Sequence, residues 1–255
     1  MLTGVKCRAT GPEYLGPVLI DPCPCDSPVA GPSVPHAAGL RDWFRRAALC
    51  QAPSHAAGRL RGVNVALLHP PGAGGRKTLL HKAIDDLGAN AVSIEFAHDD
   101  QRGTRGVAAM ARVLGRLYDA VDCANLERAT VQSIAQEAGV PVFCDLGGEQ
   151  HPVKAYGELW TIEKAVDDAG RRIRFIGNTQ AEPARTFVAA ADRLGFGIEA
   201  DGQGAQAPAV PFTVDASDPC RWTLRKGSTP VGEALRLNNR TCLIQALLLR
   251  EILGR

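Results

Sequence analysis

The sequence predicts an α/β protein in which helices flank parallel sheets, arranged in two units of which the second is shorter than the first. Short apolar stretches of strand length alternate with stretches of helical length from Val63 onward. This alternation is typical of parallel sheets covered by helices on both faces. The chain has 255 residues, enough for two modest units, and 45% of them are hydrophobic, so a substantial core can be buried.

The first unit is expected to contain four strands and the helices that connect them. The pattern predicts strands at residues 63–68, 91–96, 120–123 and 140–144, with helices at 76–87, 104–117 and 126–138. A helix at 37–50 precedes them, because four apolar residues fall on one helical face: Leu40, Trp43, Phe44 and Ala47. The arginines at 41–46 then form its solvated face. A long helix at 151–169 follows, and Pro152 suits its first turn, where the missing N–H would have no partner.

The second unit is expected to be a smaller α/β arrangement. The pattern predicts that a strand ends at residues 174–177, that a helix spans 181–194, and that strands lie at 197–200 and 210–214. Residues 201–209 are rich in small residues and predict a flexible connection. The chain closes with a helix at 238–253, which has an apolar face.

These elements divide the chain into four segments. Residues 1–35 hold seven of the 17 prolines and are expected to form an irregular N-terminal arm. Residues 36–169 form the first unit and 170–237 the reduced second unit. Residues 238–255 are expected to be a helix that packs back on the first unit.

The composition argues against several classes of partner. With 29 basic and 27 acidic residues, the net charge of +2 gives no reason to expect nucleic acid or an anionic membrane surface. No apolar stretch reaches the roughly 18 residues of a membrane span. The N-terminus lacks the basic start and apolar core of a signal peptide, so a cytoplasmic protein is expected.

Cysteine and histidine usage predicts no metal and no other cofactor. The eight cysteines are expected to be reduced thiols, because the chain is long, apolar and without signs of secretion. Cys23-Pro-Cys25 is too tight for a zinc knuckle. No histidine pair has metal-ligand spacing on a helix with a third ligand nearby.

Two segments carry a resemblance to a known family. His151-Pro-Val-Lys154 is similar to the His-Pro-x-Gln segment of the aspartate/ornithine carbamoyltransferase family, and Ala111-Arg-Val-Leu-Gly-Arg-Leu-Tyr-Asp119 resembles the ornithine branch almost letter for letter. Asn239-Arg240 resembles the pair that opens the closing helix of ornithine-type members. The resemblance covers roughly residues 60–195 and the final helix. It implies a carbamoyl-phosphate-binding domain, an amino-acid-binding domain, and an active site between them that is shared across a trimer interface.

Most residues that handle carbamoyl phosphate in that family are replaced here. The family's Ser-Thr-Arg-Thr-Arg, at a helix N-terminus where backbone N–H groups hold phosphate, corresponds to Ala73-Gly-Gly-Arg-Lys77. Gly106 takes the place of a serine in the loop that reaches the neighbouring subunit. Ala124 takes the place of the arginine that polarises the carbamoyl carbonyl. Lys154 stands where the family has glutamine.

The amino-acid side of the site is also reduced. Asn178 leads toward positions where relatives have paired asparagines, and here these positions are Ala181 and Glu182. Asp218-Pro-Cys220-Arg-Trp222 is at most a remnant of the family's His-Cys-Leu-Pro loop. The candidate catalytic residue is His151. The candidate anion site comprises Gly74, Gly75, Arg76, Lys77 and Thr78. The candidate substrate contacts are Lys154, Asn178, Cys220 and Arg240.

Each candidate has a plainer alternative. His151 is either a group that polarises a carbonyl or a buried hydrogen-bonding residue at a helix start. Residues 72–77 are either a new anion site or a loop that drifted, and they lack the glycine before Lys77 that a nucleotide-hydrolase phosphate loop requires. Lys154 is either a substituted functional group or a lysine that points to water.

Three functions are consistent with these observations. The first is a carbamoyltransferase-like protein without carbamoyl transfer, kept as a trimeric or partner-binding module. The second is a transferase whose anionic donor or amino-acid acceptor has changed. The third is a residual ornithine carbamoyltransferase, which the loss of several phosphate contacts disfavours.

Overall fold

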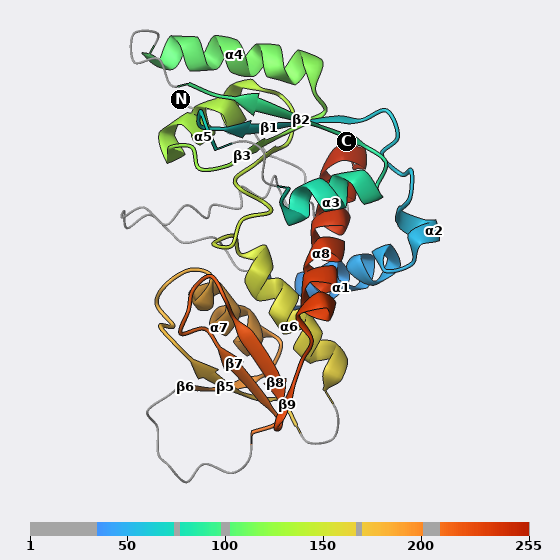
Figure 1. Cartoon of the computed structure of the whole chain (residues 1–255), viewed down its shortest axis with the longest axis vertical. Coiled ribbons are helices and arrows are strands. Elements are labelled where there is room, and N and C mark those ends of the chain that lie inside the picture. The colour runs from blue at the N-terminus through green and yellow to red at the C-terminus, as the bar shows by residue number, and fades with distance from the viewer. Residues whose placement is uncertain (1–34, 74–76, 98–102, 167–169, 201–209, 255) are drawn as a thin grey trace, which may run out of the picture.

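The computed structural model describes residues 35–73, 77–97, 103–166, 170–200 and 210–254. Residues 1–34 of the expected N-terminal arm lie outside the described residues, as do Gly74, Gly75, Arg76 and the expected connection at 201–209. One sheet lies toward each end of the molecule's long axis (Figure 1). Three helices lie between the sheets: α1 (Ala37–Cys50), α6 (Val153–Ala165) and α8 (Glu233–Leu253).

The first sheet has four parallel strands in the order β2-β1-β3-β4. The strands are β1 (Asn64–His69), β2 (Asn90–Glu95), β3 (Ala120–Cys123) and β4 (Val142–Phe143), each within two residues of its predicted start. The crossovers carry the helices α3 (Leu79–Asp86), α4 (Gly103–Leu117) and α5 (Arg128–Glu137). β1 is central and its four inner residues are buried, as its apolar sequence predicts.

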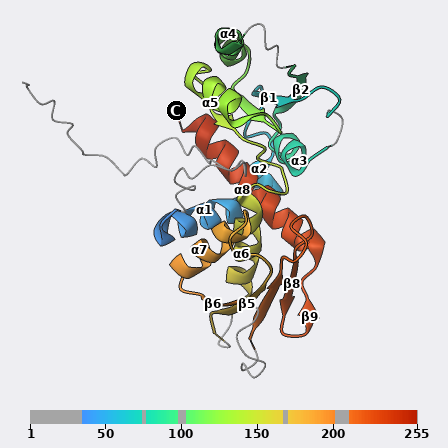
Figure 2. The ribbon, with the colours of Figure 1, turned by 90° about the vertical axis from the view of Figure 1, so that its left-hand side faces the viewer.

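Successive side chains of β1 point to opposite faces of the sheet, and each face has its own helices. Ala66 and Leu68 pack with residues of α4 and α5 in one apolar cluster. Val65 and Leu67 belong to a larger cluster that includes α1, α3 and α8. In Figures 1 and 2, α4 lies at one end of the long axis, beyond the first sheet, and α1 lies on the other side of that sheet.

The second sheet has five strands in the order β6-β5-β7-β8-β9. β5 (Arg172–Ile176), β6 (Gly197–Ala200) and β7 (Phe212–Asp215) are parallel, and α7 (Ala184–Arg193) connects the first two. β8 (Thr223–Lys226) and β9 (Thr229–Pro230) add an antiparallel hairpin that the sequence analysis did not predict. Gly227 has φ +57° in its two-residue turn, a conformation that favours glycine.

Aromatic side chains join the second sheet to its helix. The rings of Phe175 and Phe187 have centroids 5.5 Å apart, and Trp222 lies edge-on to them at 5.7 and 5.9 Å. Edge-to-face pairs at these separations are favourable beyond the apolar area they bury. The short α/β unit therefore has a core of its own, although the same apolar cluster continues into the first unit.

The central helices tie the two sheets together. Every residue of α6 from Val153 to Ile162 is buried, so this helix is enclosed on all sides. The indole of Trp43 donates a hydrogen bond to the carbonyl oxygen of Leu243 at 3.1 Å, which fixes α1 against α8. α8 begins at Glu233 rather than at residue 238, and it contacts α1, α3 and α6. A short helix, α2 (Pro53–Ala56), follows α1.

Candidate functional site

The segment that carries His151 lies at the carboxyl edge of the first sheet. β4 ends at Phe143, and the chain turns through Asp145, which has φ +54°, before α6 begins at Val153. A Cβ added to Gly147 would lie 2.9 Å from Oγ1 of Thr78 and 3.0 Å from the backbone nitrogen of Leu80. The turn therefore packs directly on the start of α3. Open α/β sheets place their ligands outside the carboxyl ends of the strands, so this edge is a reasonable place for a site.

His151 is buried and neutral. Its side chain is 2% exposed, and its Nδ1 accepts a hydrogen bond from the Val153 N–H at 3.1 Å. Burial and, to a smaller extent, the charge of Arg240 lower the pKa of His151 to about 3. Because Nδ1 accepts, the ring proton is assigned to Nε2, which has no partner among the described residues. The ring is thus a hydrogen-bond donor that solvent barely reaches.

Lys154 is a buried lysine that bridges two parts of the fold, so the expectation that it points to water is wrong. Its side chain is 5% exposed, and its Nζ lies 2.8 Å from Oε2 of Glu149. The same ammonium donates to the carbonyl oxygens of Pro219 and Cys220, each at 2.9 Å. Lys154 therefore holds the β7–β8 loop of the second unit against the start of α6.

Glu149 accepts from a second buried cation. Nη1 of Arg240 lies 3.0 Å from Oε1 of Glu149, and Nη2 donates to the carbonyl oxygens of Gly147 and Gly148. Burial acts to raise the pKa of Glu149, but Arg240 and Lys154 outweigh it and hold this pKa below its usual value. Glu149 is therefore the ion-pair partner of two buried cations, Lys154 in α6 and Arg240 in α8.

A polar cavity of about 520 Å³ opens beside these residues, between α6, β8 and α8. Lys154, Arg236 and Arg240 line it together with Glu149, Glu158 and Glu233. Arg236 and Glu158 form a buried ion pair at 2.6 Å, and burial raises the pKa of Glu158 to about 7 despite the charge of Arg236.

Several polar atoms in the walls of this cavity have no partner among the described residues. They are Oε2 of Glu158, Nε of Arg236, Nε of Arg240 and Nε1 of Trp222. Buried polar atoms nearly always have a partner, in the protein, in ordered water or in a ligand. The cavity therefore offers one acceptor and three donors to a small polar molecule.

The other predicted residues fall in different places. Lys77 and Thr78 are exposed, and Oγ1 and the backbone N–H of Thr78 lie 3.1 Å from Nδ1 of His81. Asn178 is exposed after β5, where its side chain accepts from the Gln180 N–H at 2.9 Å, and it does not line the cavity. Of the predicted substrate contacts, the polar cavity brings together Lys154, Cys220 and Arg240.

The acidic partners of Lys154 and Arg240, and the neighbouring Arg236, were not predicted from the sequence. Glu149 and Glu158 lie five residues before and four residues after Lys154, and Arg236 lies one helical turn before Arg240. The i, i+4 spacing on helices was a usable signal, because such residues share a helical face. Trp222 was passed over as part of a weak loop remnant.

The sequence of the chain is similar to those of known proteins over part of its length. No family model matches the sequence. The chain is 29% identical over 140 residues to the ornithine carbamoyltransferase of Caldanaerobacter subterraneus subsp. tengcongensis, which covers 54% of this chain and 44% of that protein. It is 30% identical over 154 residues to the ornithine carbamoyltransferase of Lactiplantibacillus plantarum, covering 59% and 44%. The chain is homologous to the ornithine carbamoyltransferases.

A solved carbamoyltransferase confirms the fold class. The structure of the Pyrococcus furiosus ornithine carbamoyltransferase aligns with a TM-score of 0.59 at 17% identity, covering 86% of this chain and 95% of that one. This likeness shows a carbamoyltransferase-like fold. The sequence matches of this carbamoyltransferase homologue nevertheless span less than half of the length of those two curated relatives. The division into domains at residues 35, 169 and 237 stays a prediction.

The described part of this carbamoyltransferase homologue contains neither a membrane-spanning helix nor a cluster of metal ligands. Its helices there include none with both the length and the hydrophobicity of a membrane span. Its His, Cys, Asp and Glu residues there form no group of three or more that is arranged to hold a metal ion.

Proposed function

We propose that this carbamoyltransferase homologue is a pseudoenzyme, a folded binding module that does not transfer a carbamoyl group from carbamoyl phosphate to ornithine. The observation that carries the proposal is the pairing of Lys154 and Arg240 with Glu149 at 2.8 and 3.0 Å. Both cations are buried and already hydrogen bonded, so neither is free to neutralise a phosphorylated substrate. Lys154 also stands where the resemblance places a glutamine.

The altered phosphate loop supports the same proposal. Ala73, Gly74 and Gly75 stand where the family has a serine, a threonine and an arginine. A hydrogen bond to a charged group contributes about 1.5–3 kcal/mol, so losing several weakens phosphate binding by orders of magnitude. Ala124 removes the guanidinium that the resemblance assigns to the carbamoyl carbonyl.

His151 supports it as well. A histidine that polarises a carbonyl must present its N–H to the substrate at hydrogen-bonding distance. Here the ring is 2% exposed, and the neighbouring Arg240 guanidinium is engaged with backbone carbonyls and Glu149. The ring is placed to stabilise the start of α6 through Val153.

The polar cavity beside Lys154 indicates what the module binds. Four cationic side chains, including Arg221, and three carboxylates line it, so a small ligand with both charges, such as an amino acid, is a better match than a simple anion. The near-balanced charge of the chain supports a cytoplasmic protein without nucleic acid or membrane partners.

The test is citrulline formation from ornithine and carbamoyl phosphate at high concentrations of pure protein, with His151→Ala as the control. We expect no citrulline above the level of the control. Activity that disappears in the control would contradict the proposal, because it would show that other residues have rebuilt the site.

A second candidate is a transferase with a changed donor or acceptor. The Nε atoms of Arg236 and Arg240 favour it, because they have no hydrogen-bond partner among the described residues and both arginines line the polar cavity. This candidate predicts that a carboxylated or phosphorylated compound raises the melting temperature, and that Lys77→Ala or Arg76→Ala removes the effect. The pseudoenzyme proposal predicts that neither substitution changes ligand protection.

A further inference from the structure

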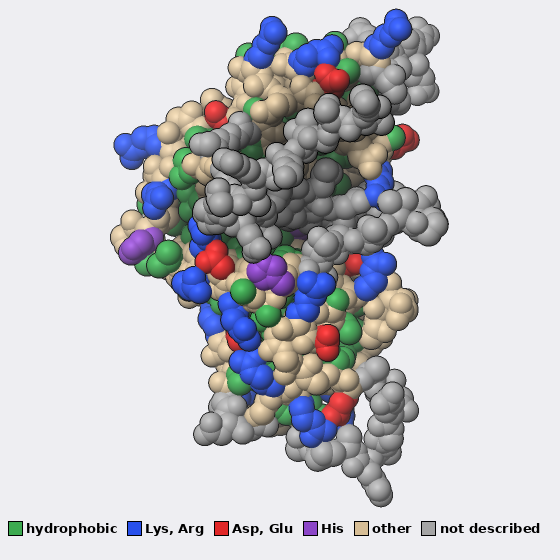
Figure 3. Space-filling model, turned by 180° about the vertical axis from the view of Figure 1, so that it is seen from behind, with side chains coloured by type: hydrophobic (Ala, Val, Ile, Leu, Met, Phe, Trp, Pro, Cys, Tyr) green, Lys and Arg blue, Asp and Glu red, His purple; other side chains and the backbone are tan. Residues whose placement is uncertain are grey.

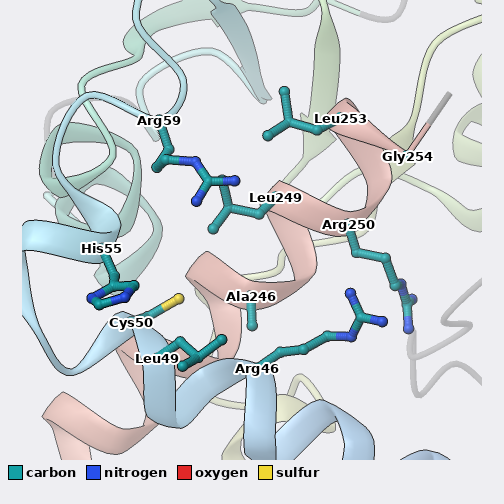
Figure 4. A pocket seen from close by; sticks show the side chains of 10 residues that line it. All are labelled: Arg46, Leu49, Cys50, His55, Arg59, Ala246, Leu249, Arg250, Leu253 and Gly254. Atoms are coloured by element: carbon teal, nitrogen blue, oxygen red, sulfur yellow. The ribbon is translucent and has the colours of Figure 1, made fainter.

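A second pocket lies at the opposite end of α8 from the candidate site. It is formed by the end of α1, by α2 and the turn after it, and by the last two turns of α8 (Figure 4). Its volume is about 340 Å³, at the lower end of the range for small-molecule sites. Arg240 and Arg250 are ten residues apart on one helix, which places the two sites about 15 Å apart along its axis.

The floor of this pocket is apolar and partly open to solvent. Leu49 of α1 faces Ala246, Leu249 and Leu253 of α8 across it (Figure 4). Leu49 is 57% exposed and Leu253 is 48% exposed, so two large apolar side chains remain in water. Covering them would contribute roughly 25 cal/mol for each Å² of apolar surface removed from water.

The rim is basic, and none of the described residues that line the pocket is acidic. Arg46, Arg59 and Arg250 contribute guanidinium groups and His55 contributes an imidazole. Arg46 is 2.7 Å from Asp42, and Arg250 is 2.6 Å from Glu251. Among the described residues, Arg59 has no ion pair and no side-chain hydrogen bond, and Figure 4 shows its guanidinium beside Leu249 at the mouth of the pocket.

The surrounding sequence strengthens the positive potential. Residues 41–61 contain five arginines and a single acidic residue, Asp42. Figure 3 shows several Lys and Arg side chains at mid-height on the rear face, with few Asp and Glu side chains among them. Local charge of one sign raises the concentration of oppositely charged ligands near the surface.

We propose that this pocket binds an amphipathic organic anion, a carboxylate or sulfonate on an alkyl or aryl body. Its body covers Leu49 and Leu249, and its anionic head accepts hydrogen bonds from Arg59. A simple inorganic anion would leave the apolar floor in water, and a neutral hydrocarbon would leave Arg59 unpaired. This inference is independent of the proposed function, because it uses no residue of the polar cavity.

The test is calorimetric titration of the full chain with sodium decanoate below its micelle concentration, alongside octyl glucoside and inorganic phosphate. We expect decanoate to bind with one site per chain, and the two other probes to bind at least tenfold more weakly. Arg59→Gln should weaken decanoate binding about tenfold, since a charge-assisted bond is lost. Leu49→Gln should weaken it severalfold.

Two matched variants serve as controls. Arg61→Gln removes an exposed arginine from the same turn without touching the pocket, and Leu235→Gln removes a leucine that is 49% exposed near the other end of α8. Both should bind decanoate as the unchanged chain does. The proposal is overturned if decanoate does not bind, if phosphate or octyl glucoside binds as tightly, or if the control variants weaken binding as much as Arg59→Gln and Leu49→Gln.

Discussion

Asp122 is a buried acid whose protonation is coupled to folding. It lies in β3 with 4% exposure, and one of its oxygens accepts the Leu146 N–H at 2.9 Å. Burial, with a smaller contribution from the charge of Asp145, raises the pKa of Asp122 to about 7 against the lowering effect of this hydrogen bond. An acid whose pKa is higher in the folded chain holds its proton more tightly there. Protonation therefore stabilises the fold, and this stabilisation is lost as the pH rises from about 4 through about 7.

Asp122→Asn should remove this pH dependence, because the amide oxygen still accepts the Leu146 N–H and does not titrate. The difference in unfolding free energy between Asp122→Asn and the unchanged chain should grow in favour of the variant as the pH rises from 5 to 8. Urea unfolding at four pH values measures it. A difference that stays constant across this range would show that Asp122 does not titrate there.

At the residue scale, the sequence predicts which residues share a site better than it predicts the hydrogen-bond partners of those residues. Resemblance placed Lys154, Cys220 and Arg240 in one site, and the structure brings these three together around a cavity. It could not predict that Lys154 is buried, because two of its partners are carbonyl oxygens more than 60 residues away. Backbone acceptors carry no sequence signature, so such a contact is visible only in the folded chain.

Gly115 sets how closely two helices approach. It lies in α4, in the segment that most resembles the ornithine branch, and a Cβ built there would lie 1.7 Å from the carbonyl oxygen of Ala138. Gly115→Ala would normally favour a helix by about 1 kcal/mol. Here the clash is with backbone, so we expect destabilisation by roughly 2–4 kcal/mol, as in overpacked cores. Urea unfolding measures it.

Gly197→Ala is the matched control for that substitution. Its added Cβ would meet other atoms only at 3.8 Å, an ordinary van der Waals distance, so its stability should change by less than about 1 kcal/mol. Equal effects of the two substitutions would refute the close-approach argument.

At the scale of elements the periodic segments were predicted and the short ones were not. All four strands of the first sheet were predicted from short apolar stretches, and β1 and β3 are buried on both faces, whereas the edge strand β2 is exposed or half-buried. The β8–β9 hairpin was missed because its strands have four and two residues and alternate with charged side chains. The first turn of α8 was not predicted either. Its leucines, Leu235 and Leu237, are exposed and do not continue the buried apolar face of the helix.

At the scale of the whole molecule, a single apolar cluster runs from the first sheet through the central helices to the second sheet. It includes Val65 of β1, Trp160 of α6, Leu243 of α8 and Phe175 of β5. The shorter length relative to the curated relatives has therefore not left the second unit without a core. Outside this cluster, apolar side chains remain in water on the first unit: Val92, Val113 and Leu117 are 36%, 52% and 63% exposed.

Those exposed side chains lie where the resemblance implies a neighbouring subunit. Val113 and Leu117 are one turn apart on α4, which directly follows the loop that reaches a partner subunit in the family. We therefore expect a trimer, with a mass three times the 27.0 kDa of the chain by light scattering at micromolar concentration. Leu117→Asp should lower the mass, because association would bury an unpaired charge. Leu235→Asp, at a residue 49% exposed on α8, should leave it unchanged. A monomer in the unchanged chain, or an equal loss of mass in both variants, would rule out this interface.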